Sequence, residues 1–157
     1  MLNWKETLRF SEFEGLTATV LLDFLRRKEP VSISFGEYGD MTELTSEAEA
    51  ATEILLQRLP DLEQIVASTA FEHYQNVSRE FKRIYGEKVE IPFAADAAAL
   101  LPFYQLQRIY LPEDSEEGRF GLGFECEWEI EHGFGIQFRN WKIVEVGGDA
   151  EAFSFYD

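Results

Sequence analysis

The chain has 157 residues, 45% of them hydrophobic and 15% aromatic, which is enough apolar material for a sizeable core in one domain spanning residues 1–157. Its formal net charge of −16 argues against binding to nucleic acid or to anionic lipid, because both are polyanions. A basic partner would be attracted instead, although acidity can also serve solubility alone.

Cys126 is the single cysteine of the sequence and cannot form an internal disulfide. It falls among the apolar positions of a predicted strand, where a free thiol behaves as a small buried hydrophobe rather than as a nucleophile. The chain opens without a signal-peptide pattern and has no run long enough to span a bilayer. We therefore expect a soluble, cytoplasmic protein.

Residues 4–35 are predicted to form strands. Alternating segments on either side of Gly15, residues 8–11 and 17–25, predict a hairpin. A charged connection over residues 26–30, closed by a proline, is expected to lead into a third strand over residues 31–35.

The pattern then changes to a helical period. Ser46 and Glu49 form a capping-box pattern, which predicts a helix over residues 46–58. A second amphipathic pattern follows, with Asp61 as its candidate N-cap, and Gly86 is expected to terminate that helix.

Weaker patterns occupy the next part of the chain. Residues 89–92 predict a brief extended segment, and Asp96 is expected to cap a short helix that Pro102 limits. Residues 105–111 predict a strand, but apolar residues occur on both of its faces, so the pattern does not say which face is buried. Residues 112–118 are expected to form a polar loop.

The clearest alternation lies between Phe120 and Val146. Every second residue from Phe120 to Ile130 is apolar, which predicts one long strand with an aromatic face toward the core. Breaks at His132-Gly133 and at residues 139–142 predict two reversals, and so a three-stranded antiparallel meander.

Strands, then helices, then strands predict an α+β fold, with a mainly antiparallel sheet and two to three helices packed on one face. Residues 152–156 are expected either to add a short edge strand or to pack their phenylalanines against the sheet.

Glutamates alternate with the apolar residues of the predicted long strand: Glu125, Glu127, Glu129 and Glu131. Carboxylates in such a row repel one another unless they are solvated or matched by cations, for which Arg108, Arg139 and Lys142 are candidates. A solvated outer face, a partner-binding surface and a metal site with His132 are the three interpretations. The spacing fits neither zinc nor calcium motifs, so we expect no metal and no cofactor.

Catalytic patterns are absent from the sequence. It has no G-x-S-x-G elbow and no usable Cys-His pair, and Gly121-Leu122-Gly123 lacks the lysine and the helix start of a phosphate loop. His73 stands alone on its predicted helix, without a second histidine at ligand spacing, and is assigned no function. A non-enzymatic protein is therefore favoured over an enzyme.

One segment carries a resemblance to a known family. Residues 125–136, E-C-E-W-E-I-E-H-G-F-G-I, followed by W-K-I-V-E-V-G, resemble the C-terminal signature W-D-x-E-H-G-[LF]-G of the DUF6985-like bacterial domains of unknown function, with Glu129 where the signature has aspartate. Similar small acidic proteins are regarded as immunity proteins or as accessory domains near bacterial toxins, so the resemblance implies a role of this kind. The resemblance implies no catalytic residue.

Two functional hypotheses follow. The first is a non-enzymatic interaction protein, possibly an immunity protein that occludes a basic toxin, with binding residues Glu125, Glu127, Glu129, Glu131, His132 and Trp141. The alternative is a small-ligand-binding protein or enzyme with a pocket near Glu131 and His132, and with Tyr104 or Tyr110 as a further polar group. Neither hypothesis involves nucleic acid or a membrane.

Overall fold

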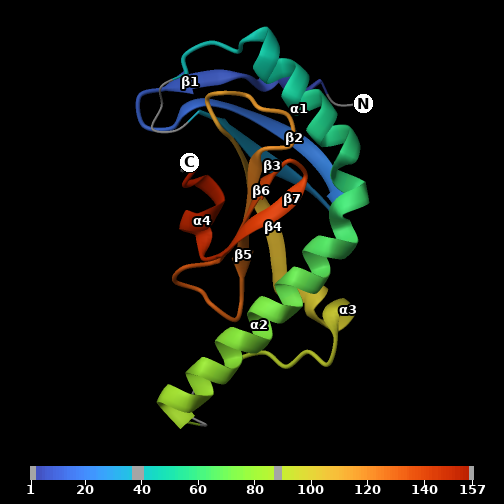
Figure 1. Cartoon of the computed structure of the whole chain (residues 1–157), viewed down its shortest axis with the longest axis vertical. Coiled ribbons are helices and arrows are strands. Elements are labelled where there is room, and N and C mark those ends of the chain that lie inside the picture. Colours follow the sequence, from blue (N-terminus) through green and yellow to red (C-terminus); the bar gives the residue numbers. More distant parts are fainter. Residues whose placement is uncertain (1–2, 37–40, 87–89, 156–157) are drawn as a thin grey trace.

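The computed structural model describes residues 3–36, 41–86 and 90–155. These residues form a seven-stranded sheet in which the order of the strands follows the chain, and all neighbours are antiparallel except β3 and β4 (Figure 1). The strands are β1 (Arg9–Ser11), β2 (Gly15–Phe24), β3 (Arg27–Phe35), β4 (Tyr104–Leu111), β5 (Phe120–Cys126), β6 (Phe134–Arg139) and β7 (Lys142–Gly147). The α+β prediction is confirmed.

The N-terminal hairpin is present, with two corrections. Residues Trp4–Thr7, expected within the strand region, form a 3-10 helix (η1), whose Trp4 stacks on Phe35. The reversal into β3 is a tight turn at Leu25-Arg26, both with positive φ, so residues 27–30 belong to the strand rather than to a charged connection. Pro30 is tolerated there because β3 pairs only with β2 at that position.

The helical layer covers one face of the sheet and makes the crossover between the parallel strands (Figure 1). It consists of α1 (Ser46–Arg58), the 3-10 turn η2 (Leu59–Leu62) and α2 (Glu63–Tyr85). Both helix predictions are confirmed, but the caps differ. The α1 N-cap is Thr45, whose hydroxyl accepts from the backbone N–H of Ala48, and Asp61 lies inside η2 rather than capping α2. Gly86, with φ 67°, ends α2 as predicted.

Asp96 caps α3 (Ala97–Leu100) as predicted and accepts from the N–H of Ala99 at 2.8 Å. A 3-10 turn, η4 (Leu101–Phe103), leads into β4. Of the predicted extended segment 89–92, residue 89 lies outside the described residues and residues 90–92 form no strand.

The register of β4 shifts between Leu106 and Arg108, where one extra residue enters the strand. Because a bulge reverses which face successive side chains point to, Leu106 and Ile109 are both buried although they have opposite parity. This bulge explains why the sequence pattern of β4 was ambiguous.

The meander of β5, β6 and β7 is confirmed, and the predicted aromatic face packs toward the helices. Phe120 opposes and stacks on Phe138, and Leu122 opposes Ile136. The long strand prediction was wrong at its end, because β5 stops at Cys126. The N–H of Gly133 donates to the carbonyl of Glu129 and closes a turn, so residues 127–133 leave the sheet.

A short C-terminal helix, α4 (Asp149–Phe153), covers the opposite face of the sheet, so residues 152–155 add no edge strand (Figure 1). The alternative expectation, packing of phenylalanines on the sheet, is met by Phe153, whose ring lies 5.3 Å from that of Tyr110 on β4, while residue 156 lies outside the described residues. The helix fits because glycines line that face: a Cβ on Gly121 would overlap the Ala152 carbonyl oxygen. The amide of Gln137 donates to the carbonyls of Glu151 and Ser154 and fastens the segment. None of the helices in the described residues is long and apolar enough to cross a bilayer.

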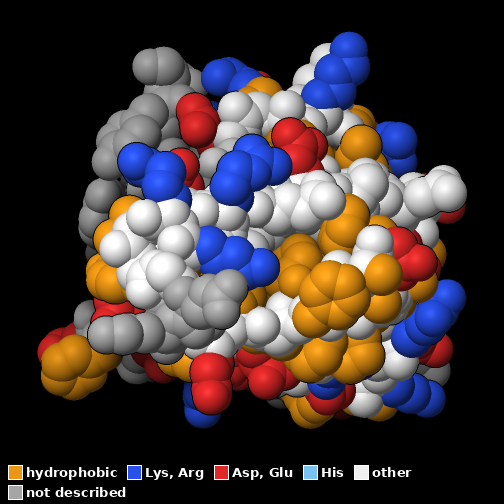
Figure 2. All heavy atoms as spheres, turned by 90° about the horizontal axis from the view of Figure 1, so that it is seen from below, with side chains coloured by type: hydrophobic (Ala, Val, Ile, Leu, Met, Phe, Trp, Pro, Cys, Tyr) orange, Lys and Arg blue, Asp and Glu red, His pale blue; other side chains and the backbone are white. Residues whose placement is uncertain are grey.

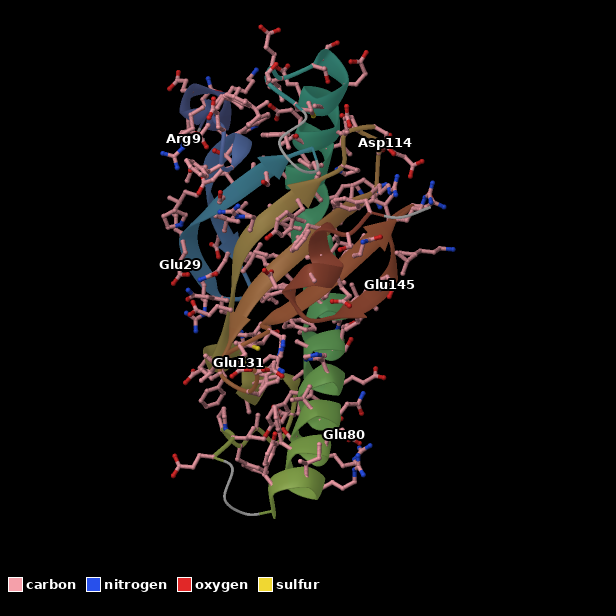
Figure 3. The ribbon with its side chains drawn as sticks, turned by 90° about the vertical axis from the view of Figure 1, so that its left-hand side faces the viewer. Arg9, Glu29, Glu80, Asp114, Glu131 and Glu145 are labelled. Carbon is pink, nitrogen blue, oxygen red and sulfur yellow. The ribbon has the colours of Figure 1, made fainter. Side chains whose placement is uncertain are left out.

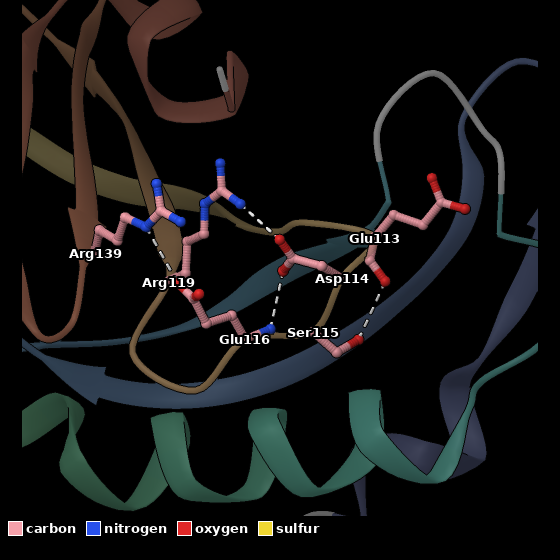
Figure 4. A network of polar contacts seen from close by, with 6 residues as sticks. All are labelled: Glu113, Asp114, Ser115, Glu116, Arg119 and Arg139. Atoms are coloured by element: carbon pink, nitrogen blue, oxygen red, sulfur yellow. Dashed lines mark hydrogen bonds and ion pairs between the residues drawn. The ribbon is translucent and has the colours of Figure 1, made fainter. Parts of the chain in front are cut away.

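The polar loop predicted over residues 112–118 extends to residue 119, and contacts among its own charged side chains hold it in place (Figure 4). The Arg119 guanidinium is 4% exposed and pairs with Asp114 at 2.6 Å, and the N–H of Glu116 donates to the same carboxylate. Arg139 of β6 pairs with Glu116 at 3.3 Å. The loop is therefore tied to the meander beside it.

Candidate functional site

The loop over residues 127–133, which joins β5 to β6, is held at both ends by backbone hydrogen bonds. The N–H of Glu127 donates to the carbonyl of Phe103 at 2.9 Å, and the N–H of Asp149 donates to the carbonyl of His132 at 2.6 Å. The Cys126 thiol donates to the carbonyl of Glu129. The loop thus presents its side chains from a fixed backbone.

Trp128 anchors the centre of this loop in the core. It is 2% exposed, and its ring packs against Tyr74, Tyr104 and Phe134 at centroid separations of 5.8, 5.5 and 6.0 Å. Its indole N–H donates to Nδ1 of His73 on α2 at 3.0 Å. Trp128 therefore fastens the loop to the helical layer, and the residues on either side of it remain at the surface.

His73 is the acceptor of that hydrogen bond, which requires an unprotonated Nδ1. Burial lowers the pKa of His73, while the nearby charge of Glu129 opposes this shift. Its role in the molecule is to position Trp128. This contact could not be predicted from the sequence, because the two residues lie on elements far apart in the chain.

A groove of about 520 Å³ runs between the loop and the last turns of α2, and we call it the acidic groove. Its lining residues are Phe81, Tyr85, Glu90, Ile91 and residues 127–132. Four of them are glutamates, and among the described residues no lysine or arginine lines it. The groove therefore combines negative charge with apolar surface.

Ile130 is the most exposed apolar side chain of the groove, at 86%. The strand prediction placed it toward the core, but the turn that ends β5 turns it outward. Tyr85 on the facing helix is also exposed. Figure 2 views the molecule from this end and shows apolar side chains gathered into a patch that both acidic and basic side chains border.

The structure brings together four of the six predicted binding residues in the acidic groove: Glu127, Glu129, Glu131 and His132. Within the groove, Nδ1 of His132 lies 3.4 Å from Glu129, whose side chain is 18% exposed. Glu125 instead accepts from the Gln107 amide at 2.6 Å and lines a neighbouring hollow.

Trp141 lies away from this groove. It occupies the β6–β7 turn, where Asn140 and Trp141 both have positive φ. Its ring is partly buried, packs on Phe120 and is covered by the Arg58 guanidinium at 4.0 Å. These contacts explain Trp141 as a packing residue of the fold.

The expected row of four carboxylates on one strand is not formed, because only Glu125 lies within β5. Two of the cations expected to neutralise this row lie elsewhere: Arg139 pairs with Glu116, and Arg108 lies on β4 opposite Gly123. The glutamates after Cys126 are separated by turn backbone rather than aligned by the pleat.

The residues of the pocket hypothesis do not converge. Tyr104 is buried in the core, and its hydroxyl has no hydrogen-bond partner among the described residues, whereas Tyr110 lies on the opposite face of the sheet. Glu131 and His132 line the acidic groove. In the described part of the chain, no three histidine, cysteine or acidic side chains are placed to hold a metal ion.

Cys126 is buried, as expected for a structural thiol. Burial raises its pKa to about 11, and the charges of Glu129 and Glu125 act in the same direction. A thiol in this environment is protonated at neutral pH and therefore a poor nucleophile.

Fold and site together define an α+β protein with an open, mostly antiparallel sheet and an acidic surface groove. Residues 4–153 match the model of a domain of unknown function, DUF6985, and the chain belongs to this family. No curated protein and no solved structure shows significant similarity to the chain.

Proposed function

We propose that this protein is a non-enzymatic interaction protein of the bacterial cytoplasm that binds a basic protein through the acidic groove, as an immunity protein would occlude a toxin. The observation that carries the proposal is that four glutamates and an exposed isoleucine line one groove that has no lysine or arginine among its described lining residues. A cationic segment bearing an apolar side chain is complementary to such a surface.

The overall charge supports the same partner chemistry. At a net charge of −16, long-range attraction would speed the encounter with a cationic surface, and the groove would then fix the orientation. Ile130 supplies the apolar contact in this proposal, in place of Trp141, because Trp141 is already packed against Phe120 and Arg58.

The experiment measures association and dissociation rates between the purified protein and a basic protein captured with it from its native host and identified by mass spectrometry. The test variant is Glu127→Lys/Glu131→Lys. Its matched control is Glu113→Lys/Glu145→Lys, which makes the same change in net charge at exposed positions outside the groove. Figure 3 shows how far apart Glu131 and Glu145 lie.

We expect the groove variant to slow association at least about tenfold at low salt, with a smaller difference at high salt because ions screen the attraction. The control variant should slow association much less. Glu129 is left unchanged because it contacts His132 and is only partly exposed. Equal rates for the two double variants at low salt would remove the groove from the interface.

The apolar contact is tested separately by Ile130→Ser. Its control is Phe13→Ser, which removes a fully exposed aromatic side chain outside the groove. If Ile130 is an anchor, dissociation should accelerate by about 30-fold, equivalent to about 2 kcal/mol. A change no larger than that of the control would refute an anchoring role.

The alternative of a small ligand at Glu131 and His132 has one observation in its favour, since both line a groove of a size that small molecules occupy. It predicts that the groove variants alter binding of a small molecule and leave every protein partner unaffected.

A further inference from the structure

The face of the sheet opposite α1 and α2 carries a second hollow, of about 600 Å³, that shares no lining residue with the acidic groove. Strands β2 to β5 form its floor, and the first residue of α4 lies at its side. Figure 3 looks onto this face, with Arg9 and Glu29 labelled along one margin. The lining is mostly polar, unlike the core face of the same strands.

Strand register explains the hollow. Ser32 of β3 opposes Thr19 on one side and Arg108 on the other, and Arg108 in turn opposes Gly123 of β5. Residues directly opposite one another share a face of the sheet. Arg108 therefore stands in a row of small residues, with Ser32 on one side and Gly123 on the other.

The guanidinium of Arg108 forms no hydrogen bond or ion pair with any other residue that the structure describes, although the residue is half-buried. Other charges around the hollow are paired: Arg9 lies 3.9 Å from Glu14, and Glu29 lies 3.6 Å from an arginine of its own strand. A partly buried guanidinium is normally satisfied by a carboxylate or another acceptor. Its acceptor is not supplied from within the described chain.

Asp149 is the corresponding anion. Its Oδ1 would lie 2.7 Å from a Cβ at Gly123, so the carboxylate sits above the residue that faces Arg108. It too forms no side-chain hydrogen bond or ion pair within the described residues. Burial raises the pKa of Asp149, and the charge of Arg108 opposes that shift. One cation and one anion thus face the same hollow without pairing with each other.

Tyr110 adds a neutral polar group to the lining of the same hollow. Its ring edge lies 3.1 Å from the same Cβ position at Gly123. Burial, followed by the charge of Asp149, raises the pKa of Tyr110 to about 12, so its hydroxyl is protonated at neutral pH and can donate or accept a hydrogen bond.

We propose that this hollow binds a small zwitterion of the free amino acid class, with its carboxylate on Arg108 and its ammonium group on Asp149. The planar guanidinium suits a carboxylate, and the hydroxyls of Thr19, Ser32 and Tyr110 provide further polar contacts. A zwitterion fits better than a simple anion because a net charge of −16 repels anions but exerts little net force on a neutral molecule.

The test is a titration of the isotope-labelled full chain, followed by NMR, with each of the free L-amino acids of proteins up to about 10 mM. At least one should shift the amide signals of Ser32, Arg108 and Gly123 in a saturable manner. The N-acetyl and the carboxamide forms of that amino acid each lack one charge and should bind at least about tenfold more weakly. Absence of saturable shifts at these residues with every amino acid would overturn the proposal.

Variants identify the contacts. Arg108→Gln and Asp149→Asn should each weaken binding at least about tenfold, and Ser32→Leu should do so by filling the space beside Arg108. Arg79→Gln and Asp61→Asn make the same chemical changes on the helical layer and should leave the affinity unchanged. Retained affinity in both Arg108→Gln and Asp149→Asn would refute the site. If acetate bound as tightly as the amino acid and Asp149→Asn had no effect, the zwitterion assignment would be wrong.

Discussion

Replacing Trp128 with alanine tests whether the loop over residues 127–133 is held from inside the core. The side chain is 2% exposed, packs against three aromatic rings and donates to His73. Truncating a buried aromatic residue of this size costs about 3–5 kcal/mol. Since whole domains are stable by only about 5–15 kcal/mol, the variant should be close to unfolding.

The hydrogen bond can be separated from the packing. Trp128→Phe keeps a ring in the site but removes the donor, which leaves Nδ1 of His73 buried without its partner, at a cost of about 1–3 kcal/mol. Adding His73→Phe removes the acceptor as well, so the loss in the double variant should be smaller than the sum of the two single losses.

Urea denaturation followed by circular dichroism measures these free energies of unfolding, provided that the slope of the transition is unchanged. Phe13→Ala, at a fully exposed aromatic residue, is the control and should change stability by no more than about 0.5 kcal/mol. A loss below about 1 kcal/mol for Trp128→Ala would refute the anchoring role, because surface substitutions have effects of that size.

Three further predictions concern the same framework. Burial lowers the pKa of His73 in the folded state, so the unfolded chain binds more protons below about pH 6.5 and stability should fall as the pH falls through that value. His73→Phe should reduce this pH dependence of the free energy of unfolding, measured in urea titrations. An unchanged dependence would exclude His73 as its source. Gly121→Ala should destabilise the protein by about 1–3 kcal/mol or more, since its Cβ would overlap the Ala152 carbonyl. Gly86→Ala meets no atom of the described residues and should cost about 1 kcal/mol from its positive φ alone. Equal losses would argue against packing of α4 on the glycines. EDTA should leave the melting temperature unchanged, and a drop reversed by one divalent metal would reveal an ion that stabilises the folded state.

Part of the acidic groove could be predicted from the sequence. Glu127, Glu129, Glu131 and His132 were predicted as binding residues from their charge and spacing, and they line one groove because they are neighbours in a single loop. The other wall comes from α2 and was not predicted. Phe81 and Tyr85 follow a helical pattern that is equally compatible with burial. Tyr85 is exposed at the end of α2, which extends beyond the sheet (Figure 1).

The hollow lined by Arg108 and Asp149 could not be predicted from the sequence. Its central row joins Thr19, Ser32, Arg108 and Gly123, which come from four strands and two distant parts of the chain. A sequence pattern gives the face of each residue on its own strand, but it does not give the register between strands. The bulge before Arg108 further conceals which residues of β4 point outward.

By itself, the sequence determined the features that depend on near neighbours. Alternation specified most of the strands, the helical period specified α1 and α2, and residues favoured at turns and caps placed several of the reversals. Tertiary structure alone decided where β5 ends, which face α4 covers and which charges remain unpaired. The reason is physical: periodicity follows from local backbone geometry, whereas register, helix packing and charge pairing depend on contacts between residues far apart in the chain.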